Sequence, residues 1–409
     1  MSIRVSGRPV ASNDVDNMTG SARERLGVMS YLAHAQFAPR GIRTRALLPA
    51  LREQWNVEMI ASPPATTNDT ITLRRGARER RLLGQMVRAV LLDKFEPRAR
   101  RQFRKWRPDV DAALLIGFPF SPLAYAARGL AQAGVPYVVD IGDPWALTAE
   151  FPAVKGLALV RARRMEREMW NAAAGAIVTT QEQAEALQPL FPKLPLCVRP
   201  NGYDPSLAHE WPAHRIKHNG TLRLGHFGSI YDARLNLQHF LNSLAACGYW
   251  DRIEFHQYGV DWTGTLSGVD FANVVMHDPR PWRAILHESV ALDAAIVIGN
   301  RDAKQLPSKA IDYLVLPIPR IALTAGGDHD ALGRYAASQP GWLVVQPEEA
   351  AAAKHVRAHV QHVWTDAELA PPASEAWPAV AHDVTAFVTA ALQSEDPALQ
   401  LKTAHRVRD

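Results

Sequence analysis

Short apolar segments alternate with longer amphipathic ones along most of the chain. Six segments in the first half are rich in aliphatic and β-branched residues, which predicts buried strands. They are LGVMSYLAHA (26–35), NVEMIAS (56–62), DAALLIG (111–117), YVVDIGD (137–143), GAIVTT (175–180) and LCVRPNG (196–202). Helical patterns lie between them, so we expect a parallel sheet with helices on both faces.

The alternation begins again after the polar stretch AHEWPAHRIKHNG (208–220). The second series consists of LRLGHFG, RIEFHQYG, VVMHD, DAAIVIG, IPRIALT and GWLVV. The pattern predicts an α/β protein with two Rossmann-like domains, 1–207 and 208–409, that face a central cleft. We expect the first twenty residues to be loose and the last helix to pack back on the first domain. Ligands of such sheets gather at the carboxyl ends of the strands.

Composition is that of an ordinary globular chain. Of the 409 residues, 47% are hydrophobic and 21% are charged, which is enough for two domains with separate cores. The two cysteines, Cys197 and Cys247, have no metal-ligand spacing, so neither a disulfide framework nor a zinc site is indicated. The N-terminus lacks an apolar signal region and no run of about 18 apolar residues occurs. We therefore expect a cytoplasmic protein.

Basic residues are concentrated in one segment. Residues 74–107 contain thirteen Lys and Arg against three Asp and Glu, whereas the formal charge of the whole chain is +5. Apolar residues recur there at helical spacing, which predicts one or two helices with an apolar and a basic face. A solvated surface, an anionic membrane surface and a phosphate-bearing substrate all fit this pattern. No recognition motif surrounds its aromatic residues, so we expect no nucleic acid partner.

Several enzyme classes lose support because their motifs are missing. The sequence has no G-x-G-x-x-G after a predicted strand, no G-x-x-x-x-G-K-[ST], no H-E-x-x-H and no G-x-S-x-G. Dehydrogenase, P-loop kinase, zinc protease and serine hydrolase functions are therefore not indicated.

One lysine stands at an unfavourable place for a cation. The stretch LPSKAIDYL (306–314) predicts a helix that begins near Pro307 and Ser308, with Ser308 as a capping residue. Lys309 then lies in the first turn, where the helix already carries partial positive charge. It can face water, pair with Asp312 one turn on, or bind an anionic ligand together with the helix terminus.

The second half resembles a known family in the order of its motifs. LRLGHFGSIYDARLNLQHFL (222–241), IEFHQYG (253–259), DAAIVI (293–298), LPSKAIDYL and PIPRIALTAGGD (317–328) are similar to the donor-binding domain of family 4 glycosyltransferases of the GT-B fold. The first half is similar in VVDIGDPW (138–145), AAGAIVTTQEQAEAL (173–187) and RPNGYD (199–204). The resemblance implies an acceptor-binding domain followed by a nucleotide-sugar-binding domain.

The family's donor-site positions carry over in part. Members have Gly-Arg a few residues before a lysine, and both cations bind the donor diphosphate. Here Ser229 follows Gly228, and Arg234 stands in place of the lysine. Of two family glutamates eight apart, the first position holds Lys304 and the second holds Asp312, which leaves recognition of the transferred sugar open.

A subgroup of the family has P-S-K-x-x-[DE]-Y at this place, and Ser308, Lys309 and Asp312 follow it. The resemblance thus implies that Lys309 faces a diphosphate. Asp312 is then either a ribose acceptor or the ion-pair partner of Lys309.

The chemistry of sugar transfer is consistent with these cations. Negative charge develops on the departing nucleoside diphosphate and is stabilised by cations and N–H dipoles or by a metal ion. No D-x-D pair directly ends a predicted strand. We therefore expect Arg234 and Lys309 to serve as catalytic cations without a metal, with the nucleotide sugar as substrate and no further cofactor.

In the first domain, Asp140 and Asp143 end the segment VVDIGD. Asp143, which precedes Pro144, can orient or deprotonate an acceptor hydroxyl, or it can cap the turn. FAPRGIRT (37–44) replaces the glycine-rich acceptor loop of the family, with Arg43 as a candidate phosphate contact. We expect His34 to pack on the first strand rather than to take part in catalysis.

The resemblance implies a retaining hexosyltransferase of the GT-B class. Its expected partners are a UDP-, GDP- or dTDP-linked sugar and a glycan or lipid-linked acceptor of envelope polysaccharide synthesis, with peripheral contact to the inner face of an anionic membrane. The alternatives are a non-catalytic binding protein of the same fold, and a nucleotide-sugar epimerase or phosphorylase.

Overall fold

The first half of the chain forms one six-stranded sheet. The computed structural model describes residues 23–34, 38–60, 91–209, 220–230, 237–268 and 273–393. Within these, the first half contains β1 (Arg25–Ser30), α1 (Pro39–Gln54), β2 (Asn56–Ile60), α3 (Glu96–Phe103), β3 (Ala112–Ile116), α4 (Phe120–Ala133), β4 (Tyr137–Ile141), α5 (Gly156–Ala172), β5 (Gly175–Val178), α6 (Gln181–Leu187), β6 (Leu196–Val198) and the 3₁₀-helix η2 (Leu207–His209). All neighbouring strands are parallel, in the order β2-β1-β3-β4-β5-β6.

The second half forms a second six-stranded parallel sheet in the order β12-β11-β10-β7-β8-β9. Its elements are β7 (Thr221–Phe227), α7 (Leu237–Ala246), β8 (Arg252–Tyr258), η3 (Thr265–Gly268), β9 (Val274–His277), α8 (Trp282–Ser289), β10 (Ala294–Ile298), α9 (Ser308–Asp312), η4 (Tyr313–Val315), β11 (Arg320–Leu323), η5 (Gly327–His329), α10 (Ala331–Ala337), β12 (Trp342–Val345), α11 (Ala352–Gln361), α12 (Asp366–Leu369), η6 (Ala373–Glu375) and α13 (Trp377–Gln393). The predicted α/β class with two Rossmann-like sheets is confirmed.

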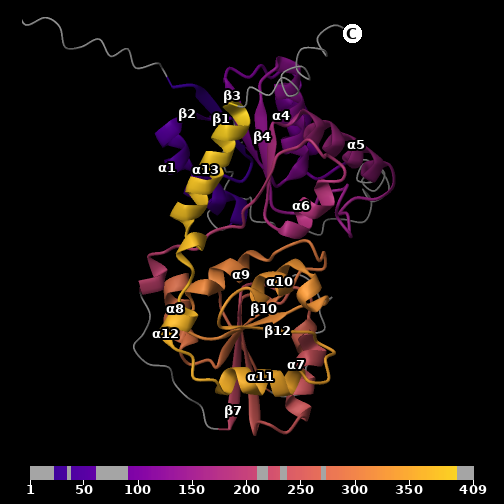
Figure 1. The fold of residues 1–409 in the computed structure, drawn as a ribbon. Coiled ribbons are helices and arrows are strands. Elements are labelled where there is room, and N and C mark those ends of the chain that lie inside the picture. Colours follow the sequence, from indigo (N-terminus) through magenta and orange to yellow (C-terminus); the bar gives the residue numbers. More distant parts are fainter. Residues whose placement is uncertain are drawn as a thin grey trace, which may run out of the picture.

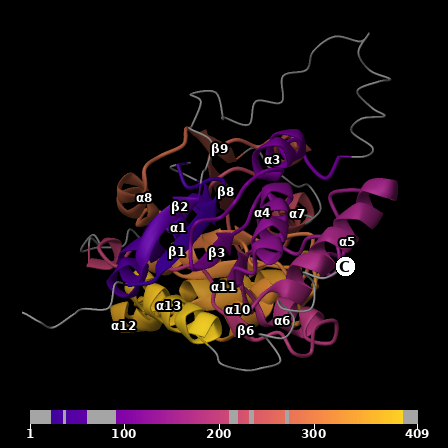
Figure 2. The same cartoon turned by 90° about the horizontal axis from the view of Figure 1, so that it is seen from above.

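Helices cover both faces of the first sheet (Figures 1 and 2). One apolar core joins one face of the strands to α3, α4 and α5, through side chains such as Ala99, Leu123 and Met165. The other core joins the opposite face to α1 and α13, through side chains such as Leu47 and Val384. The last helix of the described chain thus packs against the first sheet although it follows the second. Within the described residues, no helix combines the length and apolar character that crossing a bilayer requires.

The basic segment predicted between residues 74 and 107 is described only from residue 91 onward. α3 lies in this part, and its buried residues include Ala99 and Phe103, whereas its arginines are exposed. This part therefore has the amphipathic character that the sequence predicts. The remaining positions of the segment lie outside the described residues.

The helix predicted over LPSKAIDYL is present but short. α9 begins at Ser308 and ends at Asp312, and the chain continues as the 3₁₀-helix η4. Pro317 follows closely, and a proline disfavours helical geometry in the residue before it, which agrees with the extended backbone of Leu316. The predicted capping by Ser308 is wrong, because Pro307 is the N-cap residue and no side chain caps this end.

Candidate active site

The strand order of the second sheet reverses next to β7, which lies between β8 and β10. Chains leaving two strands at such a reversal diverge, and α/β sheets bind ligands there. Gly228 directly follows β7, and the residues after β10 lead to α9 and Lys309. Gly228 has a φ of +133°. A β-carbon at this glycine would lie 2.2 Å from Cε of Lys309, so only a glycine allows the lysine side chain to cross here.

Hydrogen bonds fix this crossing point. The buried Tyr313 hydroxyl accepts from the Phe227 N–H at 2.6 Å and lies 3.2 Å from the Phe227 carbonyl oxygen. The Gly228 N–H donates to the Tyr258 carbonyl at 2.7 Å, and the Gln257 amide donates to the Gly228 carbonyl at 2.6 Å. Tyr313, which sequence reasoning noted only as part of a motif, thereby connects the segment after α9 to the end of β7.

Lys309 is partly buried and, within the described residues, its ammonium makes no hydrogen bond or ion pair. Burial lowers its pKa, and the Asp312 carboxylate opposes this shift. The buried His226 shares this environment: burial and the Lys309 ammonium lower its pKa to about 3. The neutral His226 ring donates from Nδ1 to the Ile296 carbonyl at 2.9 Å.

Asp312 and Ser229 complete the described part of the predicted donor site. Burial raises the pKa of Asp312 to about 7, with the Lys309 ammonium acting in the opposite direction. No ion pair joins these two side chains within 4.0 Å among the described residues. Ser229 follows Gly228 and is partly exposed. Arg234, the second predicted cation, lies outside the described residues.

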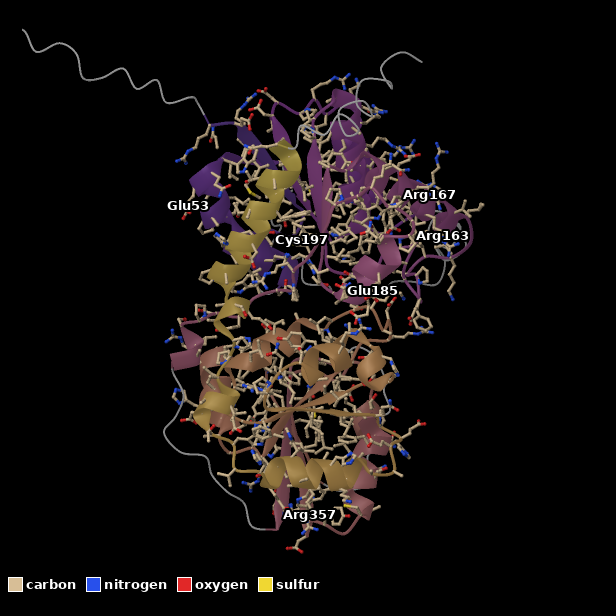
Figure 3. The ribbon with its side chains drawn as sticks, in the orientation of Figure 1. Glu53, Arg163, Arg167, Glu185, Cys197 and Arg357 are labelled. Atoms are coloured by element: carbon tan, nitrogen blue, oxygen red, sulfur yellow. The ribbon has the colours of Figure 1, made fainter. Side chains whose placement is uncertain are left out.

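Lys304, at the family's first glutamate position, contacts the first domain. Its ammonium lies 3.1 Å from the Glu150 carboxylate and 3.5 Å from Asp302. Its carbonyl accepts from the Thr180 hydroxyl at 2.7 Å, and the Asp302 carboxylate accepts from the Glu150 N–H at 2.7 Å. The loop between β10 and α9 therefore joins the two domains. Glu185, labelled in Figure 3, lies at the same junction and pairs with Arg334 at 3.6 Å.

Asp143 lies two residues after β4 and is partly buried. Its carboxylate accepts a hydrogen bond from the side-chain amide of Gln305, which belongs to the loop of the other domain. Within the described residues, no backbone N–H donates to the Asp143 carboxylate. No hydrogen bond among them therefore supports the alternative that Asp143 caps the turn. Gln305 was not identified from the sequence, because its partner is 162 positions away.

The first domain corrects two sequence expectations. Arg43 is fully buried and donates to Asp140 at 2.7 Å and to the Pro200 carbonyl at 2.8 Å, so it is a core residue and not a phosphate contact. Arg40 instead lies at the strand end, over Gly142 and beside Asp143. Burial lowers the Arg40 pKa, while the Asp140 and Asp143 carboxylates oppose the shift.

The second correction concerns His34. It lies in an exposed turn after β1, so the expectation that it packs on the first strand is wrong.

No group of three or more potential metal ligands occurs among the residues that the structure describes. Asp330 belongs to the segment Asp328-His329-Asp330 that follows β11, but its carboxylate caps α10 by accepting from the Gly333 N–H at 2.7 Å. Of the two predicted donor-site cations, Lys309 lies within the described residues.

Two parallel six-stranded sheets, with the loop after β10 connecting the two domains, give the chain the GT-B fold. Residues 35–202 match the family model of the glycosyl transferase 4-like domain. This match confirms the resemblance to family 4 glycosyltransferases. It falls in the half of the chain whose motifs are the less similar ones.

Solved structures of low sequence identity have the same fold over nearly the whole chain. Sucrose-phosphate synthase from Thermosynechococcus elongatus is 12% identical with a TM-score of 0.56, over 94% of this chain and 98% of that one. The lipopolysaccharide outer core galactosyltransferase WaaB is 11% identical (TM-score 0.52; 92% and 97% covered). Anabaena HepE in complex with UDP is 13% identical (TM-score 0.52; 93% and 98% covered). A comparison with curated proteins gives no match.

Proposed function

We propose that the protein is a retaining hexosyltransferase that transfers a sugar from a nucleotide-sugar donor to an envelope polysaccharide or a lipid-linked acceptor. The transfer takes place at the cytoplasmic face of a membrane and needs no metal ion. The glycosyl transferase 4-like domain and the GT-B fold support the transfer of a sugar. The resembled family supports retention of configuration at the transferred carbon. The outer core galactosyltransferase among the structural neighbours is consistent with a lipid-linked acceptor.

The observation that carries this proposal is the state of Lys309. Its ammonium is partly buried and has no partner among the described residues. It lies next to the neutral His226, at the reversal of the strand order. An anionic ligand at this place would neutralise the charge of the ammonium. Gly228 keeps the path of the lysine side chain open. In the transfer, the bond between the sugar and the diphosphate oxygen breaks, and charge on that oxygen is stabilised by the ammonium. Arg234 is the proposed second cation, on the grounds of its sequence position.

Asp143 has the proposed role on the acceptor side. Its carboxylate lies at the carboxyl end of β4, where it can accept the proton of an acceptor hydroxyl or orient that hydroxyl. The Gln305 amide donates to it from the donor domain. The two reactants would thus be brought together from the two domains, which lowers the entropic part of the barrier.

Calorimetric titration of UDP, GDP and dTDP tests the diphosphate site. Lys309→Met keeps an apolar side chain beside Gly228 and removes the charge. Losing one charge-assisted contact should cost on the order of 1.5 to 3 kcal/mol, roughly ten- to a hundredfold in affinity. Lys354→Met changes an exposed lysine on α11 and is the matched control. Arg234→Met should behave like Lys309→Met. Unchanged binding in both site variants would remove the proposed site.

The same titration, carried out once with magnesium and once with a chelator, tests whether binding is independent of metal. If it is, the nucleoside diphosphate affinity is equal under the two conditions. Incubation with a panel of nucleotide sugars and candidate acceptors then tests transfer. The expected product keeps the anomeric configuration of the donor, measured by NMR. Nucleotide binding without turnover of any donor would favour a non-catalytic binding protein, and a donor sugar changed without transfer would favour an epimerase.

A further inference from the structure

The outer face of α5 carries two apolar side chains that are largely exposed. Leu157 is 71% exposed and Val160 is 65% exposed. Arg164 and Arg167 follow at intervals of four and three residues, so all four side chains lie along one face of the helix. The opposite face is buried against the core. In Figure 3, Arg163 and Arg167 lie at the outer edge of the first domain.

α3 extends this surface with further arginines. α3 packs on α4, and α4 packs on α5, so the three helices cover the same face of the first sheet. Arg161 of α5 lies 2.5 Å from Glu96 of α3, so an ion pair connects the first and the last of these three helices. The exposed basic residues in and directly after α3 are Arg98, Arg100, Arg101, Arg104 and Lys105. We call α3 and the outward side of α5 the α3–α5 face.

The acidic residues of this region are buried, hydrogen-bonded or ion-paired. Glu96 is buried and accepts from the Leu92 N–H and the Tyr125 hydroxyl in addition to Arg161. Asp93 accepts from the N–H and hydroxyl of Ser121. Of the acidic residues on α5, Glu166 is buried and Glu168 is paired with Arg164 at 2.9 Å. The α3–α5 face therefore presents a net positive field to a partner.

We propose that the α3–α5 face docks on a lipid bilayer that contains anionic phospholipids. Leu157 and Val160 enter the interfacial region, and the arginines of α3 and α5 contact the phosphate groups around them. Aliphatic side chains on a basic helix that lies along the surface suit a membrane interface. Nucleic acid is less suited, because α3 and α5 bury their aromatic rings, Phe103 and Trp170, and so offer no base a surface on which to stack.

The helix that carries Leu157 and Val160 contacts the loop on the proposed acceptor side through its inner face. α5 begins shortly after the loop that contains Asp143, and Glu166 on its inner side accepts from the N–H groups of Ala146 and Leu147 in that loop. A bilayer against the outer side of α5 would hold a lipid-linked acceptor near Asp143. The docking itself does not rest on the proposed transfer reaction, since it involves none of the residues assigned to the donor.

Sedimentation with vesicles tests the docking in the absence of any donor. Vesicles of phosphatidylcholine alone are compared with vesicles of equal parts phosphatidylcholine and phosphatidylglycerol, at low and at high salt. The wild-type protein should sediment with the anionic vesicles only, and less at high salt because salt screens the attraction. Each basic residue near an anionic surface contributes about a fivefold change in binding.

Two double variants separate the charged and apolar contributions. Arg164→Glu with Arg167→Glu should lower binding at least tenfold at low salt. Leu157→Ser with Val160→Ser should lower the vesicle binding that remains at high salt. Two single variants of the second domain are the matched controls and should bind as wild type. Arg357→Glu changes a residue at the far end of that domain in Figure 3, and Val363→Ser changes a residue just after α11 that is 73% exposed.

Three results would overturn the docking surface: no preference of the wild-type protein for anionic vesicles, wild-type binding by both double variants, or an equal loss in the controls. Binding of single-stranded RNA but not vesicles, lost in the arginine variant, would assign the face to nucleic acid instead. Circular dichroism spectra and melting temperatures of the same variants should equal those of wild type, which shows that they are folded. A failure of docking therefore stays distinct from a failure of the proposed reaction.

Discussion

A β-carbon on Gly228 would lie 2.2 Å from Cε of Lys309. This contact makes the glycine part of the proposed diphosphate site although it has no side chain. Gly228→Ala must move the lysine and also places an L-residue at a φ of +133°. We expect nucleoside diphosphate affinity to fall roughly tenfold or more, since the charge-assisted contact of Lys309 is disturbed. Calorimetric titration measures this loss.

Gly248→Ala is the matched control for backbone strain. Gly248 has a φ of +71° and nothing within 4 Å of its β-carbon position. Both alanine variants should unfold more easily, by about 1 kcal/mol or more, but only Gly228→Ala should lose nucleotide affinity. Equal affinities in the two variants would mean that the position of Lys309 does not matter for binding.

The contact between Asp143 and Gln305 leads to a second prediction. Asp143→Asn keeps the size of the side chain and removes its charge and basicity. Transfer should fall about a hundredfold or more, the usual contribution of a general base, while nucleoside diphosphate affinity stays near that of wild type. Initial rates at saturating donor and acceptor, together with donor titration, measure the two quantities.

Gln305→Met is the comparison that separates chemistry from domain contact. It removes the cross-domain hydrogen bond and leaves the Asp143 carboxylate in place. If Asp143 acts on the acceptor, Asp143→Asn loses far more transfer than Gln305→Met. Equal losses would assign Asp143 to joining the domains, and full activity of both variants would leave it without a role in transfer.

The central strands were predictable because both sheets are parallel and their central strands are buried on two faces. Such strands are continuous apolar runs, which a single sequence shows directly. The expected burial of β2 and β6 is wrong: three of the five residues of β2 are exposed, and β6 is only partly buried, because both strands lie at an edge of the sheet. The strand ends were less well predicted: the first strand was expected to reach residue 35, whereas β1 ends at Ser30. Tyr31 and Ala33 are buried in the following turn, and an apolar pattern does not distinguish a buried turn from a strand.

Site residues followed from the sequence where the signal is local. The place of Lys309 in the first turn of a helix is predictable because Pro307, Ser308 and the apolar residues after them lie within one short segment. Arg43 was misassigned because its partner Asp140 is 97 positions away, so the sequence shows a cation near a strand end and not the buried pair. The same reason hides Gln305 and Tyr313, whose contacts depend on how the two sheets are assembled.

Asp312 should make stability depend on pH. Burial raises its folded pKa to about 7, above the ordinary 3.8. The folded state then holds the proton more tightly, so this contribution to stability is complete below the unfolded pKa and is lost as the pH rises through about 7. Asp312→Asn cannot ionise. Its melting temperature relative to wild type should therefore rise between pH 5 and pH 8.

Thermal unfolding without ligand across this pH range is the measurement. Asp278→Asn changes an exposed aspartate of the same domain and should show a constant difference from wild type. A flat difference for Asp312→Asn as well would show that the carboxyl is not held neutral by burial. The charge of the Lys309 ammonium opposes the effect without reversing it, because burial is the larger influence on the pKa of Asp312.

Glu166 should hold the loop that carries Asp143 through two backbone hydrogen bonds. Its Oε2 accepts from the N–H of Ala146 at 2.8 Å and of Leu147 at 2.7 Å, and its Oε1 lies 3.3 Å from the Trp170 indole nitrogen. Glu166→Gln has one acceptor oxygen instead of two, so either the loop or the indole loses its acceptor. Leaving a buried donor unsatisfied costs about 1 to 3 kcal/mol.

The comparison variant is Glu168→Gln, two residues further along the same helix, where the carboxylate is partly exposed and pairs with Arg128 and Arg164. Ion pairs of this kind contribute less than about 1 kcal/mol, so urea unfolding should distinguish the two variants. Because the loop follows Asp143, Glu166→Gln should also raise the KM for the acceptor while nucleoside diphosphate affinity stays unchanged. If the two variants unfold alike and keep the same acceptor KM, the carboxylate of Glu166 does not position the acceptor side, and the orientation of Asp143 must then depend on Gln305 and the neighbouring Arg40.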